Sequence, residues 1–489
     1  MSIQKTNSQI MYLDNQTQKI MDTTKYSFGM IGLGTMGRNL LLNMGDNGFA
    51  VAGYDKDNTK ITVLEKEGEG KPVKGFSSLN DFLASLTSPK VIMMLVPAGK
   101  IVDDVINELT PLLSKGDIII DGGNSHFTDT TERVNRLEAM GFHFFGMGVS
   151  GGEEGARRGP SMMPGGDTEA YQYMKPVFEK IAAKVNGEPC VTDIGPGASG
   201  HFVKMVHNGI EYALMQLIAD TYEIMHKSLQ LSNEEIQSVF AEWNKGRLQS
   251  YLLEITGDIF AYKEEDGSYL VDKIKDEAKS KGTGKWTTQI ATDLELPIPT
   301  IDIAVALRNL SKYKSLRTAL AAAYPAEEKK KVVDKESISK LEAAFYFSTV
   351  SIYAQGIHLL SKASAEYKYQ LKLDEIAKIW RGGCIIRAAL LENIYSAYKT
   401  NPALEHLFLD KEIQSIIKSL LPAAREIVST KIADGISIPA FANALSYFDA
   451  IRSERMPQNL IQAQRDFFGA HTYELIGKEG VFHTEWDKK

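Results

Sequence analysis

The sequence is poor in several features that would place it in other classes of protein. Two cysteines among 489 residues are too few for a disulfide framework or a cysteine-based zinc site. No apolar run approaches the ~18 residues of a membrane span, and the first 25 residues lack the apolar segment of a signal peptide. Basic residues number 55 against 62 acidic ones, and this net charge of −7 disfavours a general nucleic-acid binder. These absences predict a cytoplasmic protein that acts on a small molecule.

Length and composition indicate a globular, enzyme-sized protein with more than one domain. A chain of 489 residues exceeds one ordinary core, so two or three domains are expected. Hydrophobic residues make up 43% and charged residues 24%, as is typical of soluble globular proteins. Residues 1–25 are rich in glutamine, asparagine, threonine and lysine, which predicts a disordered leader.

A nucleotide-binding fingerprint opens the first domain. The apolar run Ser27–Ile31 leads into Gly32-Leu-Gly-Thr-Met-Gly37, a helical segment follows, and a second strand closes on Asp55. The glycines permit a tight turn and a close approach of a pyrophosphate, and the helix N-terminus supplies N–H donors to it. An acidic residue after the second strand completes the pattern in its required context. The sequence therefore predicts a dinucleotide site on a Rossmann-type α/β domain.

The alternation of strand and helix continues to about residue 195. Further buried parallel strands are predicted at Val91–Val96, Ile118–Asp121 and Phe142–Phe145. In an open α/β sheet, the loops at the carboxyl ends of the strands form the ligand crevice. One cleft should therefore be lined by Val96–Ala98, Asn124 and Ser150–Gly152.

The rest of the chain has almost entirely helical patterns. Helices are predicted at residues 201–230, 233–262, 338–364, 374–398 and 438–452. Ser232–Glu235 and Ser339–Glu342 fit capping boxes at helix starts. Similar residues recur in Leu231–Gly246 and Leu373–Gly382, each after a long helix, which is consistent with a duplicated helical unit.

One predicted helix carries an unusual polar stripe. Lys204, His207, Asn208, Glu211 and Tyr212 are spaced so that they share one helical face, while apolar residues occupy the other. Such a stripe either lines a cavity or forms a solvated face. A base, an imidazole and a carboxyl group together favour the cavity.

Three basic segments are candidates for binding an anion. Lys285 lies in the glycine-flanked loop Gly282–Thr287, which otherwise reads as a surface turn. Arg308 lies in an apolar helix, where a carboxylate or phosphate partner is expected, either in a structural salt bridge or in a ligand site. The tail segment Arg465–His471 contains two adjacent phenylalanines, which call for a packing surface on this subunit or a partner.

These motifs together closely resemble the 6-phosphogluconate dehydrogenase family over nearly everything after residue 26. The resemblance is carried by Ile120–Ser125, Gly148–Ala156, His201–Tyr212, Lys281–Trp286, Trp380–Arg387, Gln462–Asp466 and Phe468–Glu474. It implies a Rossmann domain at residues 26–198, an all-helical substrate and dimerisation domain at 199–455, and a tail at 456–489 that reaches the partner subunit. It also implies oxidative decarboxylation of 6-phosphogluconate by a homodimer, with no metal.

The resemblance assigns roles to individual residues. It makes Lys204 the general base and Glu211 the proton donor. It implies substrate binding by Asn124, Ser150, Gly151, Gly152, His207, Asn208, Tyr212, Lys285, Arg308, Arg465 and His471, the last two from the partner subunit. It implies cofactor binding by Gly32, Leu33, Gly34, Thr35, Met36, Gly37, Asp55, Lys56, Asp57, Val96, Pro97, Ala98 and Asn124.

The sequence departs from the family at the cofactor ribose. In the resembling family, the pattern of NADP-using members after the second strand is Asn-Arg-Thr. This chain has Asp55-Lys56-Asp57 at that position. Asp55 favours a ribose 2′-hydroxyl and thus NAD, whereas Lys56 is able to pair with a 2′-phosphate and favours NADP. NADP, NAD or dual use therefore all stay open.

Two rival interpretations fit the nucleotide fingerprint. Another β-hydroxyacid dehydrogenase would share the cofactor domain and the lysine, but the long helical region and basic tail disfavour it. A non-catalytic nucleotide sensor would be expected to have lost Lys204 or Glu211, and both are present.

Overall fold

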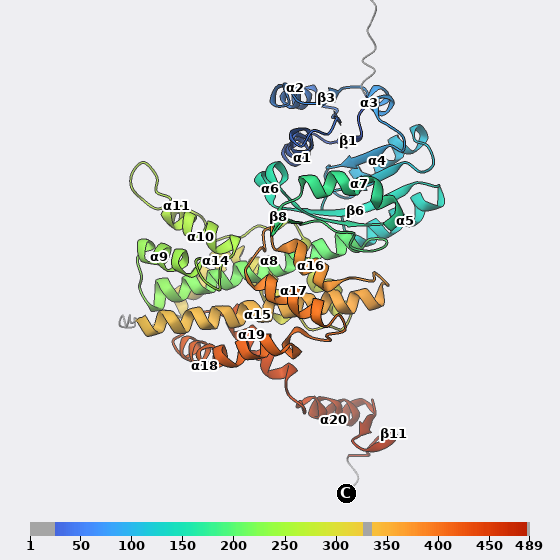
Figure 1. The fold of residues 1–489 in the computed structure, drawn as a ribbon. Coiled ribbons are helices and arrows are strands. Elements are labelled where there is room, and N and C mark those ends of the chain that lie inside the picture. The colour runs from blue at the N-terminus through green and yellow to red at the C-terminus, as the bar shows by residue number, and fades with distance from the viewer. Residues whose placement is uncertain (1–24, 326–334, 487–489) are drawn as a thin grey trace, which may run out of the picture.

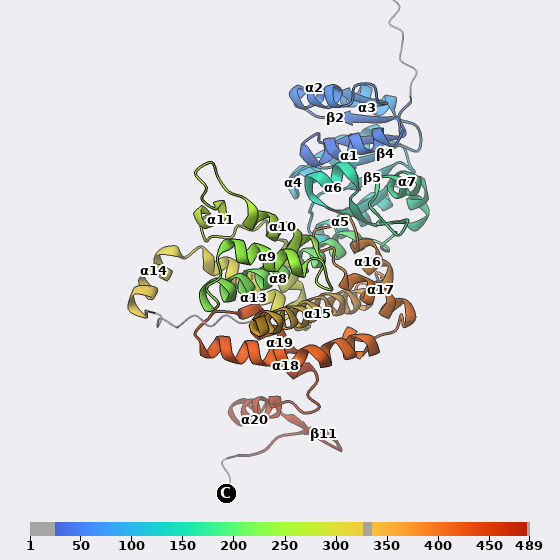
Figure 2. The same ribbon diagram turned by 60° about the vertical axis from the view of Figure 1, so that its left-hand side comes forward.

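The computed structural model describes residues 25–325 and 335–486. An α/β body, a helical body and a C-terminal tail follow one another along the chain (Figures 1 and 2). The predicted disordered leader falls on residues outside the described part, except for Lys25. No helix in the described ranges is long and apolar enough to cross a membrane.

The α/β body is a seven-stranded sheet in the order β3-β2-β1-β4-β5-β6-β7. Its elements are β1 Phe28–Ile31, α1 Thr35–Asp46, β2 Val51–Tyr54, α2 Asn58–Glu67, β3 Val73–Phe76, α3 Leu79–Ser85, β4 Val91–Met94, α4 Lys100–Leu109, η1 Thr110–Leu112, β5 Ile118–Asp121, α5 Phe127–Ala139, β6 His143–Ser150, α6 Gly152–Arg158, β7 Ser161–Gly165 and α7 Thr168–Ile181. Strands β1 to β6 are parallel, and β7 pairs antiparallel with β6. The predicted Rossmann-type sheet is confirmed.

The sheet is covered on both faces because successive strand residues point to opposite sides. Along β5, Ile118 and Ile120 pack with α1 and α7, whereas Ile119 packs with α3, α4 and α5. Helices on both faces explain the unbroken apolar runs of the central strands. Strands β3 and β7 were not predicted, because β3 is a partly exposed edge and β7 contains Pro164.

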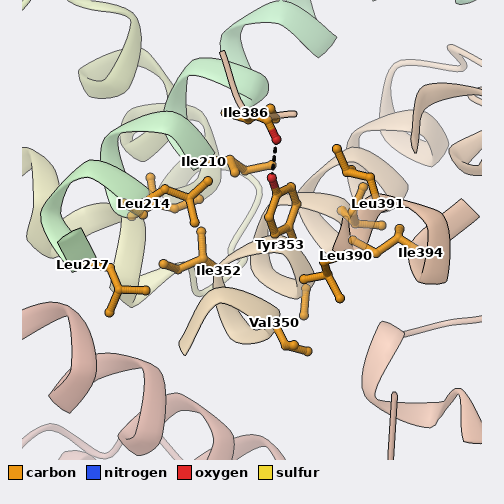
Figure 3. Packing of buried hydrophobic residues seen from close by; sticks show 14 of the residues in the cluster. Ile210, Leu214, Leu217, Val350, Ile352, Tyr353, Ile386, Leu390, Leu391 and Ile394 are labelled. Atoms are coloured by element: carbon orange, nitrogen blue, oxygen red, sulfur yellow. Dashed lines mark hydrogen bonds between the residues drawn. The ribbon is translucent and has the colours of Figure 1, made fainter. Parts of the chain in front are cut away.

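The helical body is built around two long helices, α8 and α15. Its elements are α8 Ser199–Glu223, the π-helical turn η2 Ile224–Ser228, α9 Asn233–Trp243, α10 Tyr251–Ala261, α11 Leu270–Lys273, α12 Thr283–Asp293, α13 Pro299–Ser311, α14 Lys314–Ala323, α15 Lys335–Glu366, α16 Leu373–Trp380, α17 Leu390–Thr400, η3 Leu407–Leu409, α18 Lys411–Ala433 and α19 Pro439–Ile451. A hairpin of β8 Lys184–Val185 and β9 Glu188–Pro189 precedes α8. Figure 3 shows α8 and α15 sharing one apolar core, in which the buried Tyr353 hydroxyl donates to the carbonyl of Ile386.

Several predicted helix boundaries are wrong. The segments predicted at 233–262 and 374–398 each break into two helices, because the connections 244–250 and 381–389 pair with each other instead of continuing the helices. Ala389 donates its N–H to the carbonyl of Gln249 at 2.8 Å. The capping box at Ser232 is confirmed, but Ser339–Glu342 lies inside α15. Helix α18 was not predicted at all.

The helical body has an internal two-fold pattern that agrees with the echo in the sequence. Helices α8 and α15 are each followed by a helix pair, α9–α10 and α16–α17. Asp220 of α8 accepts the N–H of Ala440 at the start of α19, and Gln355 of α15 accepts the N–H of Thr300 at the start of α13. Each long helix therefore caps a helix of the other half.

The tail stands apart from the helical body (Figures 1 and 2). It consists of α20 Gln458–Gly469 and an antiparallel hairpin of β10 Tyr473–Leu475 and β11 Lys478–Phe482, which the sequence did not predict. The carboxylate of Asp466, fully buried, accepts bonds from the N–H groups of Thr472 and Thr484 and from the indole of Trp486. One carboxylate therefore joins the helix, the hairpin and the chain end.

Candidate active site

A cavity of about 650 Å³ opens at the carboxyl ends of β1, β2 and β4. Its lining includes Gly32, Gly34, Asp55, Lys56 and the loop Val96–Pro97, all predicted to bind the cofactor. Asp57 and Ala98 lie beside lining residues but not among them, and Asn124 is exposed after β5. The cavity lies where a doubly wound sheet binds a nucleotide.

The glycine turn fits a dinucleotide. Gly32 has φ +91, and a side chain on it would meet the carbonyl oxygen of Leu95. Gly34 has no atom within 4 Å of where a Cβ would stand, so a ligand is able to approach its backbone. Helix α1 begins at Thr35 without a side-chain cap, which leaves its first N–H groups for the pyrophosphate. The remaining residues of this turn that were predicted to bind the cofactor are Leu33, Thr35, Met36 and Gly37.

Helix α8 joins the two bodies because its first turns rest on the sheet. A side chain on Gly200 would collide with the carbonyl oxygens of Gly146 and Met163. A side chain on Gly148 of β6 would likewise collide with the Cβ of Lys204. These close approaches place Lys204 against the carboxyl-terminal part of strand β6, toward the edge of the sheet at which the cavity opens.

Four of the five residues of the polar stripe of α8 are buried and the fifth, Glu211, is partly buried, so the solvated-face alternative is wrong. Lys204 is 7% exposed, His207 is inaccessible, and Asn208 and Tyr212 are 8% and 6% exposed. Burial lowers the pKa of Lys204, against the attraction of Glu211, and burial raises the pKa of Glu211, against the attraction of Lys204 and Arg308. Both shifts favour the uncharged forms, an amine and a carboxylic acid.

His207 is held neutral between two predicted substrate-binding residues. Its Nε2 lies 3.2 Å from the Ser150 hydroxyl and its Nδ1 lies 3.0 Å from the Asn208 side-chain oxygen. Burial and the neighbouring Lys204 hold the pKa of His207 well below its usual value. The imidazole therefore orients Ser150 and Asn208 without adding charge to the site.

Arg308 reaches the stripe in a different way from the expected one. Its guanidinium carbon lies 3.4 Å from the centre of the Tyr212 ring, and burial lowers its pKa. Among the described residues no carboxylate forms an ion pair with Arg308, so the predicted structural salt bridge is wrong. Lys285 lies in the first turn of helix α12 and is exposed; the preceding Gly284 packs on Tyr212, at the same end of the stripe. The positive charges of Arg308 and Lys285 near the Tyr212 phenol would suit an anionic ligand.

The connection after α16 also belongs to the site, although sequence reasoning gave it no role. The N–H of Ile385 donates to the Ser150 hydroxyl at 3.4 Å, and the Gly383 carbonyl packs against Gly151. The buried thiol of Cys384 interacts electrostatically with Lys204, and burial raises the pKa of that thiol to about 12. The sequence identified Trp380–Arg387 as a family motif, but it did not predict that this segment contacts Ser150 and Gly151.

The structure does not bring the two tail residues to the site. Arg465 and His471 are exposed, and α20 lies beyond α18 and α19 (Figures 1 and 2). In the described part of the chain, no group of histidine, cysteine and carboxylate side chains is arranged to hold a metal ion.

A dinucleotide cavity in the sheet that carries α8, together with a lysine and a carboxyl group on α8 whose pKa shifts favour their uncharged forms, defines a nicotinamide-nucleotide-dependent dehydrogenase. The model for the NAD binding domain of 6-phosphogluconate dehydrogenase matches residues 27–195, and that for the C-terminal domain of 6-phosphogluconate dehydrogenase matches residues 200–486. The chain belongs to the 6-phosphogluconate dehydrogenase family.

Individual relatives agree with this assignment over nearly the whole chain. The NADP(+)-dependent, decarboxylating 6-phosphogluconate dehydrogenase of Bacillus subtilis is 49% identical over 468 residues, which are 95% of this chain and 100% of the relative. The decarboxylating enzyme of Escherichia coli strain K12 is 48% identical, covering 95% and 99%. The solved Plasmodium falciparum 6-phosphogluconate dehydrogenase superposes with a TM-score of 0.91 at 43% identity, covering 94% of this chain and 100% of that one.

Proposed function

We propose that this protein oxidatively decarboxylates 6-phospho-D-gluconate to D-ribulose 5-phosphate and CO2, with reduction of NADP or NAD. Relatives that share about half of its residues carry the decarboxylating 6-phosphogluconate dehydrogenase name, and the Plasmodium falciparum structure was described with NADP+ and with 6-phosphogluconate. The observation that carries the proposal is the presence of the buried Lys204 and the partly buried Glu211 on one face of α8, a helix that packs on the same sheet that forms the cofactor cavity.

The cofactor site suits a nicotinamide dinucleotide. The turn Gly32–Gly37 and the first N–H groups of α1 would hold the pyrophosphate, and Val96 and Pro97 would line the path across the sheet edge. When bound, the nicotinamide supplies the hydride acceptor for the oxidation at C3 of the substrate.

Lys204 acts as the general base and acid in this proposal. Its burial favours the neutral amine, which takes the proton of the C3 hydroxyl as the carbon is oxidised. The product of this step is a β-keto acid, whose carboxylate leaves as CO2 while the electron pair moves toward the ketone. The Lys204 ammonium then returns its proton to the former keto oxygen, which yields an enediol.

Glu211 completes the reaction by protonating carbon. Burial raises the pKa of Glu211, which favours the protonated carboxyl group. Glu211 donates this proton to the enediol carbon that becomes C1 of the product, while the neutral amine of Lys204 takes the enediol hydroxyl proton as the ketone forms. Lys204 and Glu211 are seven residues apart, which corresponds to about 10 Å along a helix. Two groups at this spacing suit different carbons of one extended sugar acid.

The substrate phosphate is assigned to Tyr212, Lys285 and Arg308, completed by Arg465 of a second copy. A homodimer with exchanged tails is supported by the exposure of Phe467 and Phe468, at 58% and 72%, which an isolated chain leaves in water. His471 would enter with Arg465. We propose the same division into residues 26–198, 199–455 and 456–489, and a cytoplasmic location, which suits two free thiols.

The test is absorbance at 340 nm with 6-phosphogluconate and each cofactor, together with measurement of CO2. We expect equal amounts of reduced cofactor and CO2. Gluconate without the phosphate serves as the matched control and should react poorly. Reduction without CO2 release would instead indicate a simple hydroxyacid dehydrogenase.

A further inference from the structure

The cofactor cavity has an acidic end, at the carboxyl end of β2, where the fingerprint predicts the adenosine ribose. Asp55 follows β2 directly, is 9% exposed, and accepts the N–H of Leu33 through Oδ2 at 2.8 Å and the N–H of Asp57 through Oδ1 at 2.9 Å. Two backbone bonds fix this carboxylate between the glycine turn and helix α2. Its position at the cavity wall is therefore part of the fold.

The lysines near this carboxylate are already paired with acids. The ammonium of Lys56 lies 2.7 Å from Glu108, and that of Lys60 lies 3.3 Å from Asp55. The charged residues lining the cavity are two lysines and three carboxylates, Asp55, Asp104 and Glu108, which leaves a formal charge of −1. Among the described residues, none of those lining the cavity is an arginine. The wall therefore offers no unpaired guanidinium to a phosphate.

The nearest helix N-terminus is also occupied by a carboxylate. Asp57 caps α2, accepting the N–H of Thr59 at 2.9 Å and its hydroxyl at 2.6 Å. These hydrogen bonds lower the pKa of Asp57, so it is ionised at neutral pH. A helix N-terminus attracts anions, but here the chain's own carboxylate takes that place.

We infer that Asp55, supported by Asp57, determines cofactor specificity and makes this enzyme bind NAD in preference to NADP. This inference rests on the proposed function and specifies its cofactor. A ribose 2′-hydroxyl donates a hydrogen bond to a carboxylate, whereas a 2′-phosphate brings about two negative charges toward it. Because Asp55 is fixed by the backbone and buried, it is unable to turn away from a phosphate, and the repulsion is weakly screened.

The test is calorimetric titration of the full-length protein with NAD+ and with NADP+, without substrate, followed by kcat/KM for each cofactor. We expect NADP+ to bind at least about tenfold more weakly, which corresponds to about 1.4 kcal/mol. Adenosine 2′,5′-bisphosphate should bind more weakly than AMP by a similar factor, which isolates the ribose end of the cofactor. Equal or tighter binding of NADP+ by the unmodified protein would overturn the inference without any variant.

Variants locate the cause. Asp55→Asn with Lys56→Arg and Asp57→Thr introduces the pattern of the NADP-using relatives and should shift the NAD/NADP ratio of Kd values toward NADP by about a hundredfold. Asp258→Asn, which removes an exposed carboxylate from α10 in the helical body, is the control for loss of a carboxylate away from the cavity and should leave the ratio unchanged. An unchanged ratio in the triple variant refutes the role of Asp55. Absence of turnover with either cofactor would refute the proposed function, while the binding ratio still decides the inference.

Discussion

Replacing Asp220 by asparagine should stabilise the protein, and the gain should grow with pH. Asp220 is 2% exposed in the last turn of α8, and burial raises its pKa to about 7 from 3.8, although bonds from Gln216 and from the N–H groups of Ala440 and Phe441 oppose the shift. The folded protein therefore holds a proton here that the unfolded chain releases. Such a group lowers the free energy of unfolding as pH rises from about 4 to about 7.

The magnitude follows from the pKa difference. One pKa unit is worth about 1.4 kcal/mol, so the full loss is about 4 kcal/mol, of which about 3 kcal/mol falls between pH 5 and pH 8. Asparagine is neutral in both states and avoids this loss. The side-chain oxygen of the asparagine would accept the N–H of Ala440, which lies 2.7 Å from Oδ2 of Asp220. The side-chain NH2 of the asparagine would donate to the side-chain oxygen of Gln216 once the Gln216 amide has rotated by half a turn. The equivalent residue of the other repeat, Gln355, is already a neutral amide.

Urea unfolding followed by tryptophan fluorescence at pH 5 and pH 8 measures the effect. The gain in unfolding free energy of Asp220→Asn should be about 3 kcal/mol larger at pH 8 than at pH 5. Asp258→Asn, an exposed change on α10, should show no such difference. An equal loss of stability at both pH values would mean that the α19 N-terminus keeps the carboxylate ionised, and would refute the reasoning.

Four further changes test the proposed site. Lys204→Met should lower kcat by about 10²–10⁴-fold while substrate still binds, because the base is lost; a near-normal kcat would contradict its assignment. In the unmodified enzyme, kcat/KM should rise with pH as Lys204 loses its proton and fall as Glu211 loses its own, and Glu211→Ala should remove the falling limb and slow turnover of the 3-keto intermediate. Arg465→Ala should raise KM about tenfold with kcat nearly unchanged, and an unaltered KM would argue against the exchanged tail. Asp466→Asn should make the tail more sensitive to proteolysis and raise KM as Arg465→Ala does; a resistant tail would show that the buried carboxylate does not organise it.

Much of the α/β body was predictable because its signals are local. Strands β1, β4 and β5 are apolar runs, and the turn after β1 carries glycines at fixed spacings, so composition over a few residues was sufficient. The edge strand β3 was not recognised because it alternates exposed and buried positions and contains Gly75. The hairpin of the tail was missed because few of its residues are buried and its fold depends on Asp466, which lies up to 20 residues from its partners.

The helical body shows where periodicity is insufficient. Helical spacing continues through residues 244–250 and 381–389, but there the two connections bond to each other across the repeats. A local pattern contains no information on a partner more than 130 residues away. For the same reason the sequence did not predict that the Arg308 guanidinium stacks on the Tyr212 ring; of its two alternatives, only the structural salt bridge with a carboxylate was wrong.

By itself the sequence determined the nucleotide fold, the polar stripe of α8 and the family, because these depend on spacing along the chain. It also placed an acid, a lysine and a second acid at the cofactor ribose. Only the tertiary structure decided that the stripe is buried, that Ser150 and Ile385 meet beside it, and that Asp55 is fixed by the backbone of Leu33. Burial and long-range contacts set the protonation of Lys204 and Glu211, because a pKa responds to the solvent and charges that surround a group.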